Sequence, residues 1–108
     1  MPSTTIARGN SLSTFYIAPS ITPSAVATVT TAAQTFNIPG LLTTDIIQVI
    51  GYQGSQTTGI IIAEADCLTT GVLTIQFGNV TAGSVTPAAG VYVLQIVRAE
   101  GPLPVTAV

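Results

Sequence analysis

Apolar and polar residues alternate with a period of two along several stretches of this 108-residue chain, and this alternation is the strongest constraint on its fold. The clearest case is residues 72–78. There Leu73, Ile75 and Phe77 alternate with small or polar neighbours, as in a strand that buries one face. No stretch shows the 3.6-residue periodicity of an amphipathic helix. The sequence therefore predicts an all-β domain.

Residues 34–50 read as a strand, a turn and a second strand. Phe36 and Ile38 alternate with polar residues, and Pro39 followed by Gly40 then interrupts the strand. A β-branched run resumes at Ile46. Asp45, just before it, is expected to fix the turn by accepting hydrogen bonds from backbone amides rather than to act in catalysis.

The last expected strand, residues 91–99, is apolar on both faces. In a two-sheet sandwich only one face of each sheet meets the core, and no helix is available to cover the other. A second copy of the chain is the simplest cover, because exposed apolar patches mark interaction sites. The residues predicted for this subunit interface are Ile60, Ile62, Tyr92, Leu94 and Ile96. Alternation alone does not decide which face is core and which is interface.

The predicted organisation has three parts. Residues 1–24 form an extended N-terminal arm, residues 25–100 a small antiparallel β-sandwich of jelly-roll-like type, and residues 101–108 an extended tail. The arm is rich in Ser, Thr and Pro, so a disordered leader is the alternative. Its compact apolar patch favours docking on a neighbouring subunit or partner, with Phe15, Tyr16 and Ile17 as anchors.

Charge is scarce in this chain. Charged residues make up 6% of it, the net charge is −2, and the only cations are Arg8 and Arg98. Two arginines cannot neutralise a run of phosphates, so no nucleic-acid partner is expected. We also expect no membrane partner and no secretory export, because we find no basic amphipathic segment, no apolar run long enough to span a bilayer and no secretory signal. With 47% hydrophobic residues, much of its surface is expected to be covered by partners.

The residue types that most enzymes use are missing. There is no His or Lys, so the usual general base and Schiff-base chemistry are absent, and the single Cys67 fits an inert buried thiol. Glu64 and Asp66 lie on one strand face and could form a glycosidase pair or half of a calcium site. Carboxylates that are solvated, or that block unwanted strand pairing, are the favoured interpretation. We therefore expect no enzymatic activity, no metal, no cofactor and no small-molecule substrate.

Several motifs of the central and C-terminal regions, taken in order, carry a family resemblance. They are residues 34–41, 45–49, 73–81, 85–92 and 97–98. This pattern, from about residue 29 to residue 98, resembles small bacteriophage virion β-proteins of the capsid decoration or cement type. Thr44 stands before Asp45 where glycine is more usual in that family. The resemblance implies a virion β-domain that assembles as a trimer, and it brings no catalytic residues.

The expected function is that of a non-enzymatic virion structural protein. It would decorate or cement the capsid surface as a homotrimer that bridges major capsid protein subunits, after assembly in the host cytoplasm. The alternative is a β-module of a head fibre, tail or receptor-binding assembly, with loop 51–58 or 79–90 contacting a host glycan. A receptor module should carry exposed loop aromatics, and Tyr52 is the only aromatic residue in either loop.

Overall fold

The computed structural model describes residues 11–103 and 105. Within this part of the chain all regular structure is β, and no helix is long and apolar enough to cross a membrane. The strands are β1 (Ser11–Ile17), β2 (Ser20–Ile21), β3 (Thr30–Asn37), β4 (Ile46–Tyr52), β5 (Ile60–Thr69), β6 (Val72–Asn79) and β7 (Gly90–Ala99). The prediction of a small all-β fold is confirmed.

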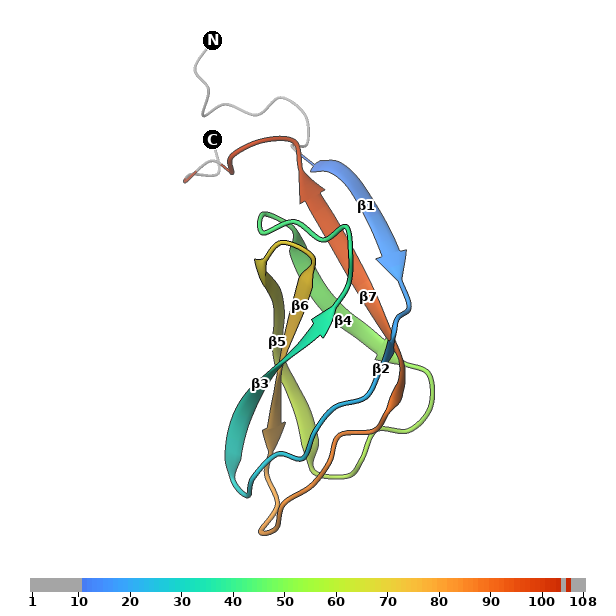
Figure 1. Ribbon diagram of the computed structural model, residues 1–108, viewed down its shortest axis with the longest axis vertical. Helices are drawn as coiled ribbons and strands as arrows, with labels where there is room; N and C mark the ends of the chain where they lie inside the picture. Colours follow the sequence, from blue (N-terminus) through green and yellow to red (C-terminus); the bar gives the residue numbers. More distant parts are fainter. Residues whose placement is uncertain (1–10, 104, 106–108) are drawn as a thin grey trace.

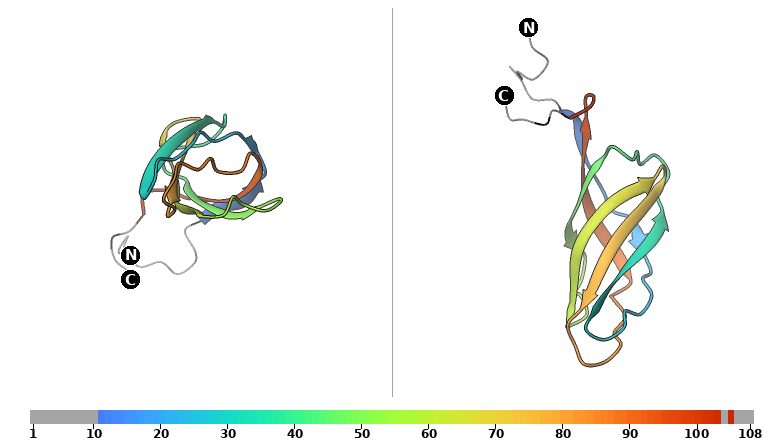
Figure 2. Two further views of the ribbon diagram at one scale, coloured as in Figure 1. Left: turned by 90° about the horizontal axis from the view of Figure 1, so that it is seen from below. Right: turned by 90° about the vertical axis from the view of Figure 1, so that its left-hand side faces the viewer.

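The strands form one antiparallel sheet in the order β1-β7-β4-β5-β6-β3, with the short β2 also paired to β7 (Figure 1). The sheet is open but strongly curled, so that its strands surround a common interior when viewed along the long axis (Figure 2). As a result, β1, β7 and β4 face β5, β6 and β3 across a common interior, in a sandwich-like arrangement. A single residue pair, Ile47 with Ala65, connects the two halves through the β4–β5 ladder. A groove of about 260 Å³ follows this seam.

The core fills the space between the two halves. Leu73, Ile75 and Phe77 from β6 are completely buried, as their alternation predicts. From the opposite side β7 contributes three further fully buried side chains: Tyr92, Leu94 and Ile96. The rings of Phe77 and Tyr92 meet edge-on, with their centroids 6.2 Å apart.

Residues 34–50 form a strand, a turn and a strand, as predicted. Gly40 in the turn has a φ of 98°, a conformation that glycine adopts without steric cost. The side chains of β5 do not alternate regularly along the whole strand. Cys67 is buried, but Ile61 points outward, because the β5–β6 register shifts between Ile62 and Glu64. A bulge of this kind places an extra residue in one strand and reverses which side chains face the core.

The predicted boundary between arm and domain at residue 25 differs from the structure. Residues 11–17 of the predicted arm form β1, which pairs with β7 of the same chain, and residues 20–21 form β2. The first ten residues of that arm lie outside the described part. Of the predicted tail, residues 101–103 and 105 are described, and they form no strand or helix.

The chain turns sharply at Val29, just before β3. Val29 has a φ of 46°, a left-handed conformation that β-branched residues rarely adopt, and its side chain is 74% exposed. This conformation costs an L-residue about 1–2 kcal/mol, which exceeds the entropic cost of glycine. Val29→Gly is therefore expected to raise the free energy of unfolding, measured by urea denaturation, by roughly 0.5–1 kcal/mol.

The matched control for this substitution is Val80→Gly. Val80 is also exposed, at 65%, and its φ is not positive. Glycine there relieves no strain and should leave stability unchanged or lower it. Equal losses of stability in both variants would contradict strain at Val29.

Candidate interaction surface

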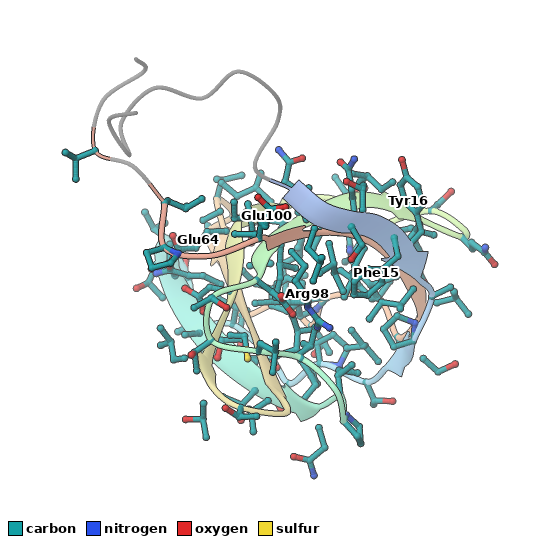
Figure 3. The ribbon with its side chains drawn as sticks, turned by 90° about the horizontal axis from the view of Figure 1, so that it is seen from above. Phe15, Tyr16, Glu64, Arg98 and Glu100 are labelled. Carbon is teal, nitrogen blue, oxygen red and sulfur yellow. The ribbon has the colours of Figure 1, made fainter. Side chains whose placement is uncertain are left out.

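The three residues predicted as docking anchors do not point in the same direction. Phe15 and Ile17 are opposite Ile96 and Leu94 of β7, and they pack on the core from the inner side of the sheet. The guanidinium of Arg98 lies 5.2 Å from the centre of the Phe15 ring. Tyr16 alone points outward and is 61% exposed (Figure 3). The prediction of three outward anchors is thus corrected to one, because neighbouring residues of a strand face opposite sides.

Four of the five residues predicted for the subunit interface belong to the core of the chain itself. Tyr92, Leu94 and Ile96 are 0% exposed, and Ile60 is 9% exposed. Ile62, the fifth, is partly buried against the same core. The interpretation of the apolar face of β7 is corrected accordingly: the curled sheet brings β6 over this face, so it has no need of a second copy.

The other face of β7 is the apolar surface that remains uncovered. Val93, Gln95 and Val97 lie on it. On one side Tyr16 of β1 is opposite Gln95, and on the other Ile46 and Gln48 of β4 are opposite Val97 and Gln95. We call this surface the outer face, and its members are Tyr16, Ile46, Gln48, Ile50, Val93, Gln95 and Val97. It carries no charged side chain, and Ile46 and Ile50 are about half exposed.

The outward side of the other half-sheet has a different character. Glu64 and Asp66 of β5 are opposite Gln76 and Thr74 of β6. Thr35 of β3 continues this polar surface on the other side of Thr74. Strand β5 also exposes Ile61 and Leu68, at 52% and 73%, but its outward side carries carboxylates as well. The outer face of β1, β7 and β4 differs because its apolar side chains share a surface without charge, and contact with another protein would bury them.

The two carboxylates of β5 have unequal surroundings. Glu64 is exposed beside the β4–β5 groove, which Asp66 does not line. The Oδ1 atom of Asp66 is buried without a hydrogen-bond partner. Among the described residues no three His, Cys, Asp or Glu side chains gather as a metal site would require. A cleft between the two carboxylates, which a glycosidase pair would need, is not formed by this groove.

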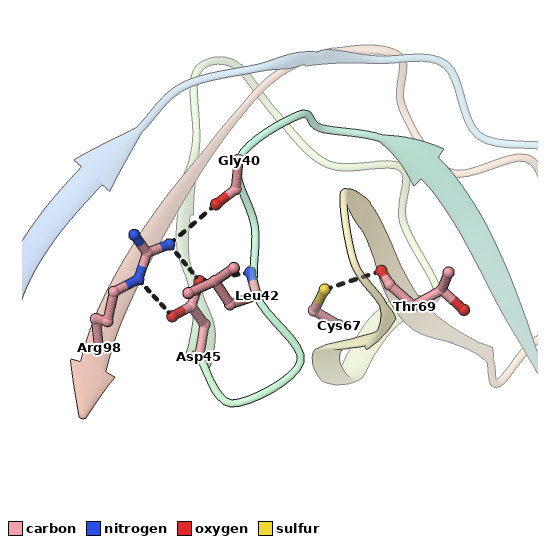
Figure 4. Close-up of polar contacts among 6 residues, drawn as sticks. All are labelled: Gly40, Leu42, Asp45, Cys67, Thr69 and Arg98. Carbon is pink, nitrogen blue, oxygen red and sulfur yellow. Dashed lines mark hydrogen bonds and ion pairs between the residues drawn. The ribbon is translucent and has the colours of Figure 1, made fainter. Parts of the chain in front are cut away.

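Asp45 and Arg98 form a bidentate ion pair at one end of the sheet (Figure 4). The Nε and Nη2 atoms of Arg98 donate to the two carboxylate oxygens at 2.8 and 2.7 Å. The Leu42 amide donates to Oδ2 at 2.9 Å, so Asp45 fixes the turn as predicted. Arg98 also donates to the Gly40 carbonyl. The pair thus joins the turn before β4 to the end of β7.

This ion pair makes stability depend on pH. The hydrogen bonds from Arg98 hold the pKa of the Asp45 carboxyl below its ordinary value, against the opposing effect of burial. A depressed pKa contributes stability that is complete above the unfolded-state value of about 3.9 and is lost as the pH falls through the lower folded-state value. The difference in unfolding free energy between wild type and Asp45→Asn should therefore be largest near neutral pH and shrink below about pH 4. A difference that stays constant from pH 7 to acid would contradict this role.

A second polar cluster joins the loops at the opposite end, and the sequence analysis missed it. The Tyr92 hydroxyl donates to the Ala88 carbonyl at 2.6 Å and accepts a hydrogen bond from Gln56 Nε2 at 2.9 Å. Gln56 Oε1 accepts from the Ala88 amide. Burial raises the pKa of Tyr92. No sequence signal marks the role of Gln56 in this cluster, because Tyr92 and Ala88 lie more than thirty residues away along the chain.

Comparison with protein-family models, with curated proteins and with solved structures finds no match to this chain.

Proposed function

We propose that this chain is a non-enzymatic structural protein of a bacteriophage virion. It decorates or cements the capsid as a homotrimer that bridges subunits of the major capsid protein. The observation that carries the proposal is the outer face: an uncharged, partly apolar sheet surface that water solvates poorly and that a protein partner would cover. The motifs between residues 29 and 98 resemble those of decoration proteins, and this resemblance is the reason for proposing the capsid as the binding partner.

A β-module of a head fibre, tail or receptor-binding assembly is the second candidate. Glycan-binding loops commonly present a free aromatic ring. Tyr52 does not offer one, because its ring packs 4.8 Å from that of Tyr92 and its hydroxyl donates to the Ala89 carbonyl. This internal packing favours decoration over receptor binding.

Co-sedimentation with capsids tests the proposal. Capsids of the encoding phage, assembled without this chain, are mixed with the purified protein and sedimented. The protein is expected to co-sediment at a saturable, fixed ratio to major capsid subunits and to make the shells more resistant to heat. Labelling that appears on tails or fibres, with none on capsids, would favour the second candidate. Absence of the chain from virions would overturn both.

A further inference from the structure

Strand β1 forms one free edge of the sheet. Within the described residues it pairs with β7 on one side only, so the backbone groups on its other side have no strand partner. From Ser13 to Ile17 its pairing with β7 is regular. A regular edge strand is a template for another strand, because its free N–H and C=O groups can continue the ladder.

The usual protections of an edge strand are weak in β1. All seven of its residues are uncharged, and none is proline. Its one irregularity, between Ser11 and Ser13, lies at its start. The other edge of the sheet is different: the backbone of Ser24 exchanges two hydrogen bonds with the side chain of Gln34, so preceding chain folds back against β3. Of the two edges, β1 is the more open to a partner.

We propose that β1 pairs antiparallel with β1 of a second copy, about a two-fold axis that passes beside Thr14. Thr14 is the midpoint of the strand, so this register pairs all seven residues. It also places Leu12 opposite Tyr16 of the other copy, and these are the most exposed apolar side chains of β1, at 64% and 61%. Each would cover the other across the strands. Self-pairing brings no like charges together, because β1 has none.

This contact goes beyond the proposed function. A two-fold contact between identical edges is isologous, whereas contacts within a trimer are heterologous. The β1 pairing would therefore connect one trimer to another rather than build the trimer. It would also join two outer faces into one continuous sheet surface.

Disulfide cross-linking of the full chain tests the pairing independently of the trimer. Across the axis, Thr14 of one copy is directly opposite Thr14 of the other, at a Cα separation of about 4.5–5.5 Å, which a disulfide can span. Thr14→Cys, oxidised with copper phenanthroline, should give a two-chain species as the main band on a non-reducing denaturing gel. The controls are the wild type, whose Cys67 is buried, and Thr35→Cys on exposed β3. Both controls should stay single chains.

Each outcome of the cross-linking experiment either supports or overturns the contact between the two β1 strands. A two-chain band from Thr14→Cys alone supports the contact. No band, or equal bands from Thr14→Cys and Thr35→Cys, overturns it. A band only when Thr14→Cys is mixed with Tyr16→Cys also overturns it, because the axis would then pass beside Phe15. Failure here leaves capsid binding untouched, so the two proposals fail separately.

A charge exchange provides a second measurement, which needs no oxidation. Thr14→Lys and Thr14→Asp each place like charges face to face across the axis and should abolish the pairing. Mixing the two variants should restore it, as measured by light scattering. Restoration of this kind is expected only where a residue faces its own counterpart, and a mixture that stays unpaired would contradict the two-fold axis.

Discussion

Leu94→Asp is expected to prevent folding. Leu94 is completely buried between the two halves of the sheet, so aspartate there loses the apolar contacts and places an unpaired carboxylate in the core. The combined cost is at least about 5 kcal/mol, which is comparable to the entire stability of a domain of this size. The variant should accumulate as unfolded or aggregated protein without the cooperative thermal transition of the wild type.

Val93→Asp is the matched control. Val93 is the preceding residue on the same strand, but it lies on the outer face. Aspartate there remains hydrated, so the monomer should fold with nearly the stability of the wild type. The variant should nevertheless lose the trimer contact, because the charge falls in the middle of an otherwise uncharged surface. Equal folding of both variants would contradict the assignment of the two faces of β7.

Phe77→Ala is expected to lower the free energy of unfolding by about 3–5 kcal/mol. Phe77 is completely buried on β6 and contacts Tyr92 of β7 across the interior. The β4–β5 ladder joins the two halves of the sheet through one residue pair. Side-chain packing between β6 and β7 therefore supplies much of the free energy that holds the two halves together. Urea denaturation followed by far-ultraviolet circular dichroism measures the loss.

The control for this substitution is Gln76→Ala on the polar outward side of the same strand. Its side chain donates one exposed hydrogen bond to Thr31, and its removal should cost less than about 1 kcal/mol. A small effect at Phe77, similar to that at Gln76, would show that the core does not hold the two halves together.

The alternation of residues predicted much of the fold because β6 is regular along its whole length. Its inward residues and the turn at Gly40 follow directly from residue type. The alternation failed in β5, because the bulge near Ala63 has no signature in the sequence. The predicted start of the domain at residue 25 does not coincide with a strand, because the chain there forms one isolated bridge from Val26 to Val85 and then turns at Val29.

The candidate surface was only partly predictable, for a topological reason. A strand with two apolar faces shows that one face needs a cover, but which face depends on where the distant β6 lies after the sheet curls. The predicted interface therefore fell on the core side of β7. Likewise Phe15 and Ile17 were assigned to a docking arm, because nothing local reveals that β1 pairs with a strand about eighty residues later.

The measurement that tests the central claim most directly is the native mass of the purified chain over a range of concentrations. The uncharged outer face predicts assemblies of the 10.9 kDa chain, and the resemblance to decoration proteins implies three copies as the basic unit. Val93→Asp is expected to break the three-copy unit while the chain stays folded. A wild-type protein that remains a soluble, folded single chain at high concentration would contradict the account.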